Sequence, residues 1–142
     1  MRSLTILKNI LYKKIMLNGN KQTSEKLLLK SLKNVQKTVN KKNFKDLTKL
    51  ALINSSPVFY IKKIKRKRKN SLEFPFLLKP NLRISYSLNF MLKSSEKKKS
   101  FIHYFSNELL NSSRNSSFSV KKTQDIYKES FVKKKFANYR WF

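Results

Sequence analysis

The sequence contains no cysteine, one histidine and one glycine. Without cysteine it can form no disulfide, no thiolate zinc site and no cysteine nucleophile. Gly19 stands alone, so there is no glycine-rich loop that could hold a nucleotide phosphate. His103 lies beside an apolar helical stripe, and we interpret it as a hydrogen-bonded, partly buried side chain. These absences argue against nucleotide-dependent and metal-dependent chemistry.

Acidic residues are also scarce. Seven Asp and Glu stand against 34 Lys and Arg, which gives a formal net charge of +27 at pH 7. Each carboxylate is isolated among lysines, so the sequence offers no pair of titratable groups for acid and base catalysis. We therefore expect no enzyme, no cofactor and no metal site.

Positive charge on this scale destabilises a free compact chain by self-repulsion, so a polyanionic partner is indicated. Nucleic acid fits best, because Lys and Arg that neutralise phosphates release condensed counterions whatever the base sequence. An anionic membrane surface is the alternative, since lysine-rich amphipathic helices bind one. However, the charge is spread over the whole chain, and no window approaches the roughly 20 apolar residues of a membrane span. We expect neither a membrane nor a homo-oligomer.

A dense basic segment lies in the middle of the chain, within residues 57–80. Its flanks are rich in aromatic and β-branched residues, which predicts a β-hairpin, with Asn70 and Ser71 as the turn. A two-stranded ribbon is marginally stable by itself, so we expect a polyanion to complete it. The alternative is an exposed basic loop that maintains solubility. The basic residues of this arm are Lys62, Lys63, Lys65, Arg66, Lys67, Arg68 and Lys69.

Apolar residues at steps of three and four predict three helices before the arm and three after it. The first three are expected from Leu4 to Leu17 with a stop at Asn18 and Gly19, from a Thr23 or Ser24 cap to Val39, and from Asn43 to before Pro57. The fourth and fifth helices are expected to begin at Asn81 and at residues 94–96. After a loop at 111–117, the sixth is expected to run from near Lys121 to Arg140, with Val132, Phe136 and Tyr139 facing inward. With 142 residues, 39% of them hydrophobic, the chain suits one domain, residues 1–142. The predicted fold is mainly α, a six-helix bundle with a protruding two-stranded basic β-hairpin between helices three and four.

Several short motifs resemble small-subunit ribosomal protein seven. Residues 134–141, Lys-Lys-Phe-Ala-Asn-Tyr-Arg-Trp, are similar to that family's closing Ala-Phe-Ala-His-Tyr-Arg-Trp, and residues 121–126 to the opening of the same helix. Residues 15–25 resemble its Leu-Met-Val-Asp-Gly-Lys-Lys-Ser-Thr-Ala-Glu turn. Residues 51–54 followed by Pro57 resemble the helix that leads into its hairpin, and residues 106–109 its Ala-Asn-Glu-Leu.

This resemblance implies a helical bundle with a β-ribbon that binds the 3′ major domain of small-subunit rRNA and nucleates head assembly near the exit tRNA site. The implied partners are small-subunit rRNA, neighbouring head proteins, exit-site tRNA and mRNA. Tyr139 and Trp141 either stack on bases or pack on the bundle. The implied rRNA-binding residues are the seven basic residues of the arm together with Lys21, Arg83, Lys121, Lys122 and Arg140.

The chain also departs from that family. Its basic N-terminal arm is expected to be nearly absent and its C-terminal tail missing, and charged residues replace the glycines usual at the hairpin tip. Lysine outnumbers arginine by 28 to 6 and there are 14 asparagines, a bias typical of coding DNA rich in A and T. We expect a protein encoded and used in an organelle, a mitochondrion in preference to a plastid. The alternative function is a DNA-packaging protein whose basic β-arm grips a duplex.

Overall fold

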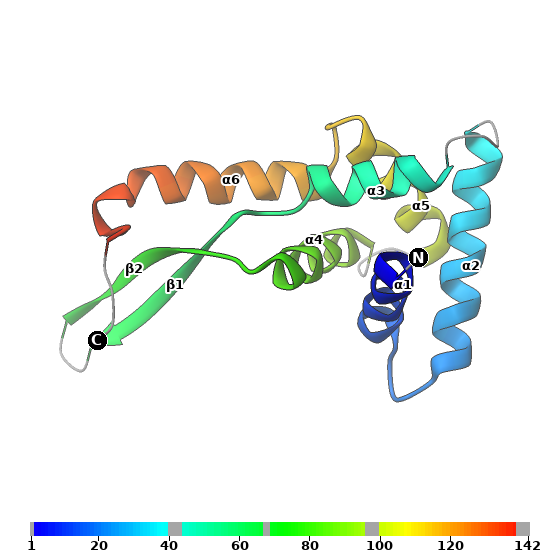
Figure 1. The fold of residues 1–142 in the computed structure, drawn as a ribbon, viewed down its shortest axis with the longest axis horizontal. Helices are drawn as coiled ribbons and strands as arrows, with labels where there is room; N and C mark the ends of the chain where they lie inside the picture. Colours follow the sequence, from blue (N-terminus) through cyan, green and yellow to red (C-terminus); the bar gives the residue numbers. More distant parts are fainter. Residues whose placement is uncertain (1, 40–43, 67–68, 96–99, 139–142) are drawn as a thin grey trace.

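The computed structural model describes residues 2–39, 44–66, 69–95 and 100–138 (Figure 1). Within these ranges the chain forms six α-helices and one two-stranded antiparallel sheet, inserted between the third and fourth helices. The predicted fold class is therefore confirmed. The elements are α1 (Arg2–Ile15), α2 (Lys21–Thr38), α3 (Phe44–Asn54), β1 (Phe59–Arg66), β2 (Lys69–Leu77), α4 (Pro80–Ser95), α5 (Phe101–Ser113), α6 (Phe118–Val132) and the 3-10 turn η1 (Lys134–Phe136).

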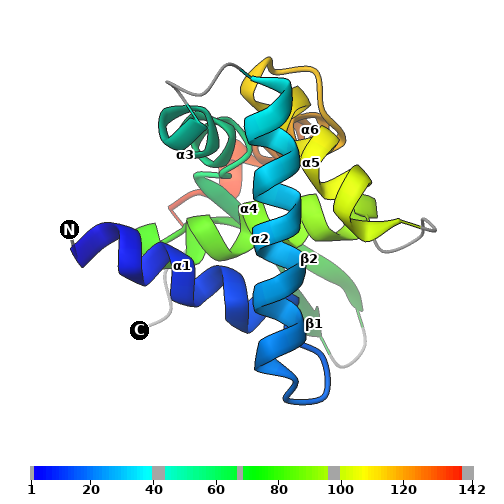
Figure 2. The ribbon, with the colours of Figure 1, turned by 90° about the vertical axis from the view of Figure 1, so that its right-hand side faces the viewer.

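The hairpin and the main group of helices lie at opposite ends of an elongated molecule. Figure 1 shows α1, α2 and α5 at one end, the β1–β2 hairpin projecting at the other, and α6 running along the hairpin side. From the helical end, α2 crosses in front of α1 and α4 (Figure 2). Helix α6 contacts β1, and η1 contacts β2, so these two elements support the base and the length of the hairpin.

One apolar cluster holds α1 to α5 together, and most of its members lie on the predicted stripes. Each Val, Leu, Ile, Phe or Met side chain in it contributes about 1.5–3 kcal/mol when it is fully buried. The buried side chains of the cluster are Tyr12, Ile15, Leu28, Val35, Ala51, Leu52, Leu88, Met91, Leu92, Phe105 and Leu109.

Buried serines are a second component of the packing, and the apolar pattern does not predict them. The Ser106 hydroxyl of α5 donates to the carbonyl of Ser31 in α2 at 2.9 Å. The hydroxyls of Ser55, just after α3, and Ser87 of α4 hydrogen-bond to each other. Because these polar groups are paired, they can be buried without the cost of an unsatisfied hydrogen bond. They link helices that are far apart in the sequence.

The connection between α1 and α2 differs from the prediction in position. Helix α1 ends at Ile15, and Gly19 has the left-handed φ of +75° expected for it, although it lies in the turn beyond the helix. Helix α2 begins at Lys21, so the predicted caps Thr23 and Ser24 are helical. Their hydroxyls donate back to main-chain carbonyls three residues earlier, a local bond that competes with capping.

The predicted hairpin is confirmed, but its turn is not at Asn70 and Ser71. Both residues belong to β2, and Arg66 stands opposite Lys69 in the antiparallel register. Lys67 and Arg68, between the two strands in the sequence, lie outside the described residues. The register shifts between the pairs Ile64–Leu72 and Arg66–Lys69, so Asn70 and Ser71 lie at a β-bulge or irregularity within β2, where residues of turn type are tolerated.

The last two helices begin and end at residues other than those predicted. Residues 94 and 95, where the fifth helix was expected to begin, still belong to α4, and α5 starts at Phe101. The loop that follows α5 is shorter than predicted, because the helix continues to Ser113. Helix α6 starts at Phe118, where the Ser117 hydroxyl accepts from the main-chain nitrogen of Val120 at 3.2 Å. It ends at Val132, whose side chain is exposed, so the prediction that Val132 points inward is wrong.

Candidate nucleic-acid interface

The register of the hairpin places its described lysines on both faces of the ribbon. Lys62 stands opposite Phe74, and Lys63 stands opposite Glu73. Successive residues of a strand point to opposite faces, so Lys62 and Lys63 diverge. Both side chains are exposed to solvent. The ribbon can therefore present positive charge to a polyanion from either side.

The base of the arm is fixed to α6 through one tyrosine. The Tyr127 hydroxyl accepts a hydrogen bond from the main-chain nitrogen of Val58 at 3.2 Å and donates to the carbonyl of Ser56 at 3.4 Å. Its ring packs edge-on against Phe59, with centroids 6.1 Å apart. These contacts join the first residues of the arm to the middle of α6.

Further along, β2 is held by the turn that follows α6. Phe74 is only 2% exposed, and its ring centroid lies 5.6 Å from that of Phe136. The carboxylate of Glu73 forms ion pairs with Lys133 and, at 2.7 Å, with the ammonium of Lys63. Because α6 stops at Val132, the chain can turn so that Phe136 and Lys133 both reach β2. The end of the helix thus serves to support the arm.

Strand β1 also meets α4, through Tyr60 on the ribbon face that carries Phe74. The rings of Tyr60 and Tyr86 lie 5.4 Å apart between centroids. Burial raises the pKa of the Tyr86 phenol, and the neighbouring Tyr60 raises it further, so Tyr86 stays neutral at physiological pH. Arg83, a predicted RNA contact, is half-buried on α4, and its Nε is buried without a hydrogen-bond partner in the described part of the chain.

The remaining predicted contacts do not form one patch with the arm. Lys121 and Lys122 are exposed near the start of α6, close to the middle of the molecule. Lys21 opens α2 at the end remote from the hairpin, and its ammonium lies 3.9 Å from Glu25 (Figure 1). The predicted residues are thus distributed along the long axis, as suits a partner that is itself extended.

Some of the predicted RNA-contacting residues lie where the structure does not describe the chain or its side chains. Lys67, Arg68 and Arg140, and the neighbouring Tyr139 and Trp141, lie outside the described residues. Three more are described only through the strand backbone, without their side chains: Lys65, Arg66 and Lys69.

Sequence reasoning missed the residues that support the arm. Glu73 stands directly opposite Lys63 in the hairpin. An acid in the second strand of a hairpin whose first strand is rich in lysine could have predicted a cross-strand ion pair. Lys133 gave no such signal, because its partner is 60 residues away. Exposed lysines on and after α6 also extend the basic surface toward the arm: Lys128, Lys134 and Lys135.

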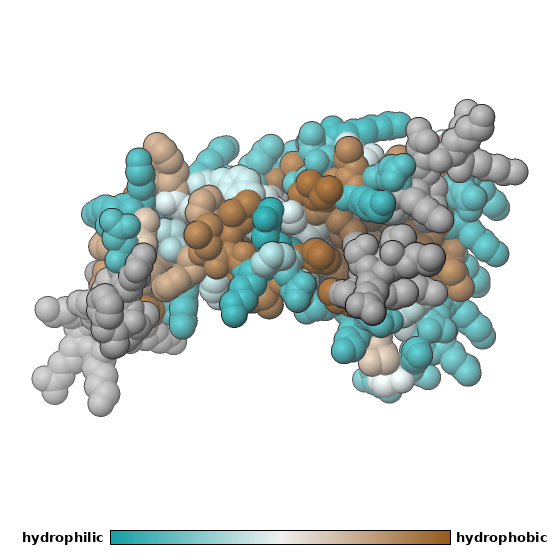
Figure 3. Space-filling view, in the orientation of Figure 1, coloured by the Kyte–Doolittle hydropathy of each residue, from teal (hydrophilic) through white to brown (hydrophobic). Residues whose placement is uncertain are grey.

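The surface facing the viewer in Figure 3 is hydrophilic along the outer side of α2, with apolar side chains over α3 and α4. Leu50 and Ile53 of α3 and Leu82 of α4 are among the exposed apolar residues.

In the described ranges, no helix has the length and apolar character to cross a bilayer. The same residues include no group of three metal-ligating side chains. His103 is exposed, contrary to the expected partial burial, and its Nε2 lies 3.1 Å from Nδ2 of Asn107.

Comparison with known proteins identifies the family. Residues 4–134 match the model of the ribosomal protein S7p/S5e family. The small ribosomal subunit protein uS7 of Heliobacterium modesticaldum is 30% identical over 89% of this chain and 81% of its own length. That of Geotalea uraniireducens is also 30% identical, with the same coverage, and that of Sulfurovum sp. is 26% identical over 89% of this chain and 82% of its own. The chain belongs to the ribosomal protein S7p/S5e family.

Proposed function

We propose that this protein is a structural component of a small ribosomal subunit that binds rRNA through its basic arm. The observation that supports this most directly is the exposed lysine-rich hairpin held against α6 in a member of a ribosomal protein family. The relatives named above are small-subunit proteins, which favours the ribosomal hypothesis over the DNA-packaging alternative.

Binding would depend on phosphate charge. Lys62 and Lys63 extend from opposite faces of a ribbon whose base is held by Tyr127 and whose middle is held by Phe136. Such a support fixes the direction of the arm before binding, so less conformational entropy is lost on association. Contacts of this kind orient a protein on RNA and read little base sequence.

The finer parts of the proposal come from the resemblance and the composition. We place the protein on the 3′ major domain of small-subunit rRNA, where it organises assembly of the head near the exit tRNA site, beside other head proteins. The excess of lysine over arginine and the 14 asparagines favour an organellar gene rich in A and T, and we place the protein in the mitochondrion, with the plastid as the alternative.

Sedimentation of a native extract through a sucrose gradient tests this proposal. The protein should migrate with the small subunit in magnesium and leave that fraction after ribonuclease treatment. Fractionation of organelles before lysis should place it with mitochondrial ribosomes. Migration as a free protein, or with nuclease-treated DNA complexes, would contradict the ribosomal role, and recovery with plastid ribosomes would contradict only the location.

A further inference from the structure

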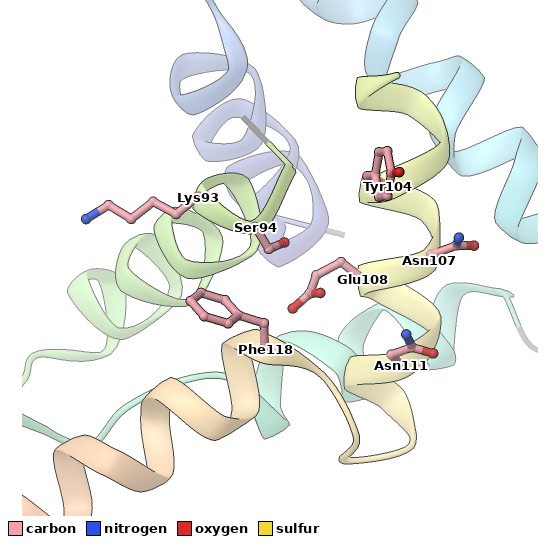
Figure 4. A pocket seen from close by; sticks show the side chains of 7 residues that line it. All are labelled: Lys93, Ser94, Tyr104, Asn107, Glu108, Asn111 and Phe118. Atoms are coloured by element: carbon pink, nitrogen blue, oxygen red, sulfur yellow. The ribbon is translucent and has the colours of Figure 1, made fainter. Parts of the chain in front are cut away.

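A cavity of about 500 Å³, lined by both polar and aromatic side chains, lies away from the arm, between the end of α4, one face of α5 and the start of α6 (Figure 4). A cavity of this volume is within the range of small-ligand pockets. Glu108 extends into it from α5, Phe118 borders it from α6, and Lys93 stands at its α4 side. None of these three residues takes part in the contacts that support the arm.

Glu108 is a buried carboxylate with unused hydrogen-bonding capacity. Its side chain is 9% exposed, and Oε1 accepts from the main-chain nitrogen of Ser119 at 2.9 Å. The described residues provide no ion-pair partner for it. A carboxylate can accept about four hydrogen bonds, and a buried charge is costly unless such donors are supplied. A ligand that presents donors would satisfy it.

Two aromatic side chains border the same cavity. Phe118 is 52% exposed although it is an apolar residue in the first turn of α6, and its ring lies near the Glu108 carboxylate (Figure 4). Tyr104 lies one turn before Glu108 on α5. An exposed aromatic face beside a hydrogen-bonding group is the arrangement that accepts a planar heterocycle.

We propose that this cavity binds an unpaired guanine base of RNA, a proposal that rests on the rRNA-binding function above. The Watson–Crick edge of guanine presents N1–H and N2–H side by side, which matches the two oxygens of a carboxylate, and no other standard base has two adjacent donors there. Phe118 would stack on the base, and Lys93 would meet a neighbouring phosphate. The site adds base recognition to a protein whose arm contacts phosphate.

An arginine side chain from a neighbouring protein also has paired donors. The charge of this chain disfavours it, because 34 basic residues against 7 acidic ones repel a cationic partner and attract a polyanion. The exposed Lys93, which lines the cavity, acts in the same direction. The base is therefore the better occupant, and the arginine becomes an outcome of the test.

Glu108→Gln separates recognition from folding. The amide oxygen of Gln can still accept from the Ser119 nitrogen, so the start of α6 keeps its hydrogen bond. With its oxygen held by Ser119, the Gln side chain points its amide N–H groups into the cavity. These donors would then face the N1–H and N2–H donors of guanine, so the base could no longer be bound there. Glu129→Gln is the matched control, because it makes the same change at an exposed glutamate of α6 that does not line the cavity.

The first experiment titrates the full chain with the four nucleoside monophosphates and follows the Ser119 amide by NMR. GMP should bind more tightly than AMP, CMP and UMP by roughly tenfold. Glu108→Gln should remove that preference, Phe118→Ala should weaken GMP binding by roughly tenfold, and the control should change neither. Equal binding of all four nucleotides, no binding at all, or binding of N-acetylarginine amide in place of GMP would overturn the proposal.

The second experiment uses a fragment of small-subunit rRNA and a dicarbonyl reagent that modifies N1 and N2 of unpaired guanine. Wild type and Glu129→Gln should protect one guanine that Glu108→Gln leaves reactive. If all three proteins bind the fragment and no protection depends on Glu108, the cavity proposal fails and the rRNA-binding function stands. If none binds the fragment, the rRNA-binding function fails, and the nucleotide titration decides the cavity separately.

Discussion

At the scale of single residues, support of the arm depends on a few side chains that are not basic. Phe74 is 2% exposed in a strand whose neighbouring side chains are half-buried or exposed, because Phe136 covers it. The position of Phe136 was predicted to be inward from its place in the pattern, and it does pack against the fold. Val132 was predicted inward for the same reason and is exposed, because α6 ends there and the direction of the chain changes.

Truncation of Phe74 should destabilise the protein strongly. Phe74→Ala removes a buried ring and leaves a cavity beside Phe136, so we expect a loss of about 3–5 kcal/mol in the free energy of unfolding. Leu77→Ala is the control in the same strand: its side chain is 75% exposed, and it should cost less than about 0.5 kcal/mol. Urea denaturation measures both. A small, equal effect of the two substitutions would show that Phe136 does not hold the arm.

At the scale of elements, the sequence predicted which segments are helix and strand far better than where they end. The core stripes of α2, α4 and α5 were found because apolar spacing reports one continuous buried face. The ends depend on local geometry: the hydroxyls of Thr23 and Ser24 bond to main-chain carbonyls three residues earlier, and Asn70 and Ser71 lie in β2 where the strand register shifts.

The distribution of predicted contacts also belongs to this scale. Spacing along the chain could identify the basic arm, because its seven basic residues fall within residues 62–69. It could not reveal that Glu73 and Lys133 meet, or that Lys21 lies at the other end of the molecule, because both depend on how separate elements pack. Nor could it find the cavity beside Glu108, which three elements form together.

The junction between α6 and the arm should depend on the Tyr127 hydroxyl. Tyr127→Phe keeps the edge contact with Phe59 and removes the hydrogen bonds to Val58 and Ser56. We expect a loss of about 1 kcal/mol in stability and faster hydrogen exchange at the Val58 amide. NMR-detected exchange measures the local effect. Unchanged exchange at Val58 would contradict the role of Tyr127 as the anchor of the arm.

At the scale of the whole molecule, charge opposes the packing described above. The apolar cluster and the buried serine bonds hold the helices together, while a net charge of +27 repels within the same chain. The ion pairs of the described residues offset little of this, since most of their groups are substantially exposed. Stability should therefore depend on whatever screens or neutralises the positive charge.

Thermal unfolding of the RNA-free protein should reveal this repulsion. When ionic strength rises from about 0.01 M to about 0.15 M, the Debye length falls from roughly 30 Å to roughly 8 Å. We expect the melting temperature to rise by roughly 4 °C, equivalent to about 1 kcal/mol for a chain of this size. Calorimetry in sodium chloride measures the shift. A melting temperature that stays constant or falls would show that self-repulsion is not a significant term.

The most direct test of the proposed function is the salt dependence of binding to an rRNA fragment of the 3′ major domain. Replacing Lys65, Arg66, Lys67 and Arg68 by alanine removes four charges from the arm, and should weaken binding and reduce the slope of log K against log salt by about 3 in magnitude. The control replaces four exposed lysines of α2 (Lys26, Lys30, Lys33 and Lys37) and removes the same net charge far from the arm. We predict a clearly flatter slope for the arm variant than for the α2 variant. Equal slopes for the arm variant and the wild type would contradict phosphate binding by the arm.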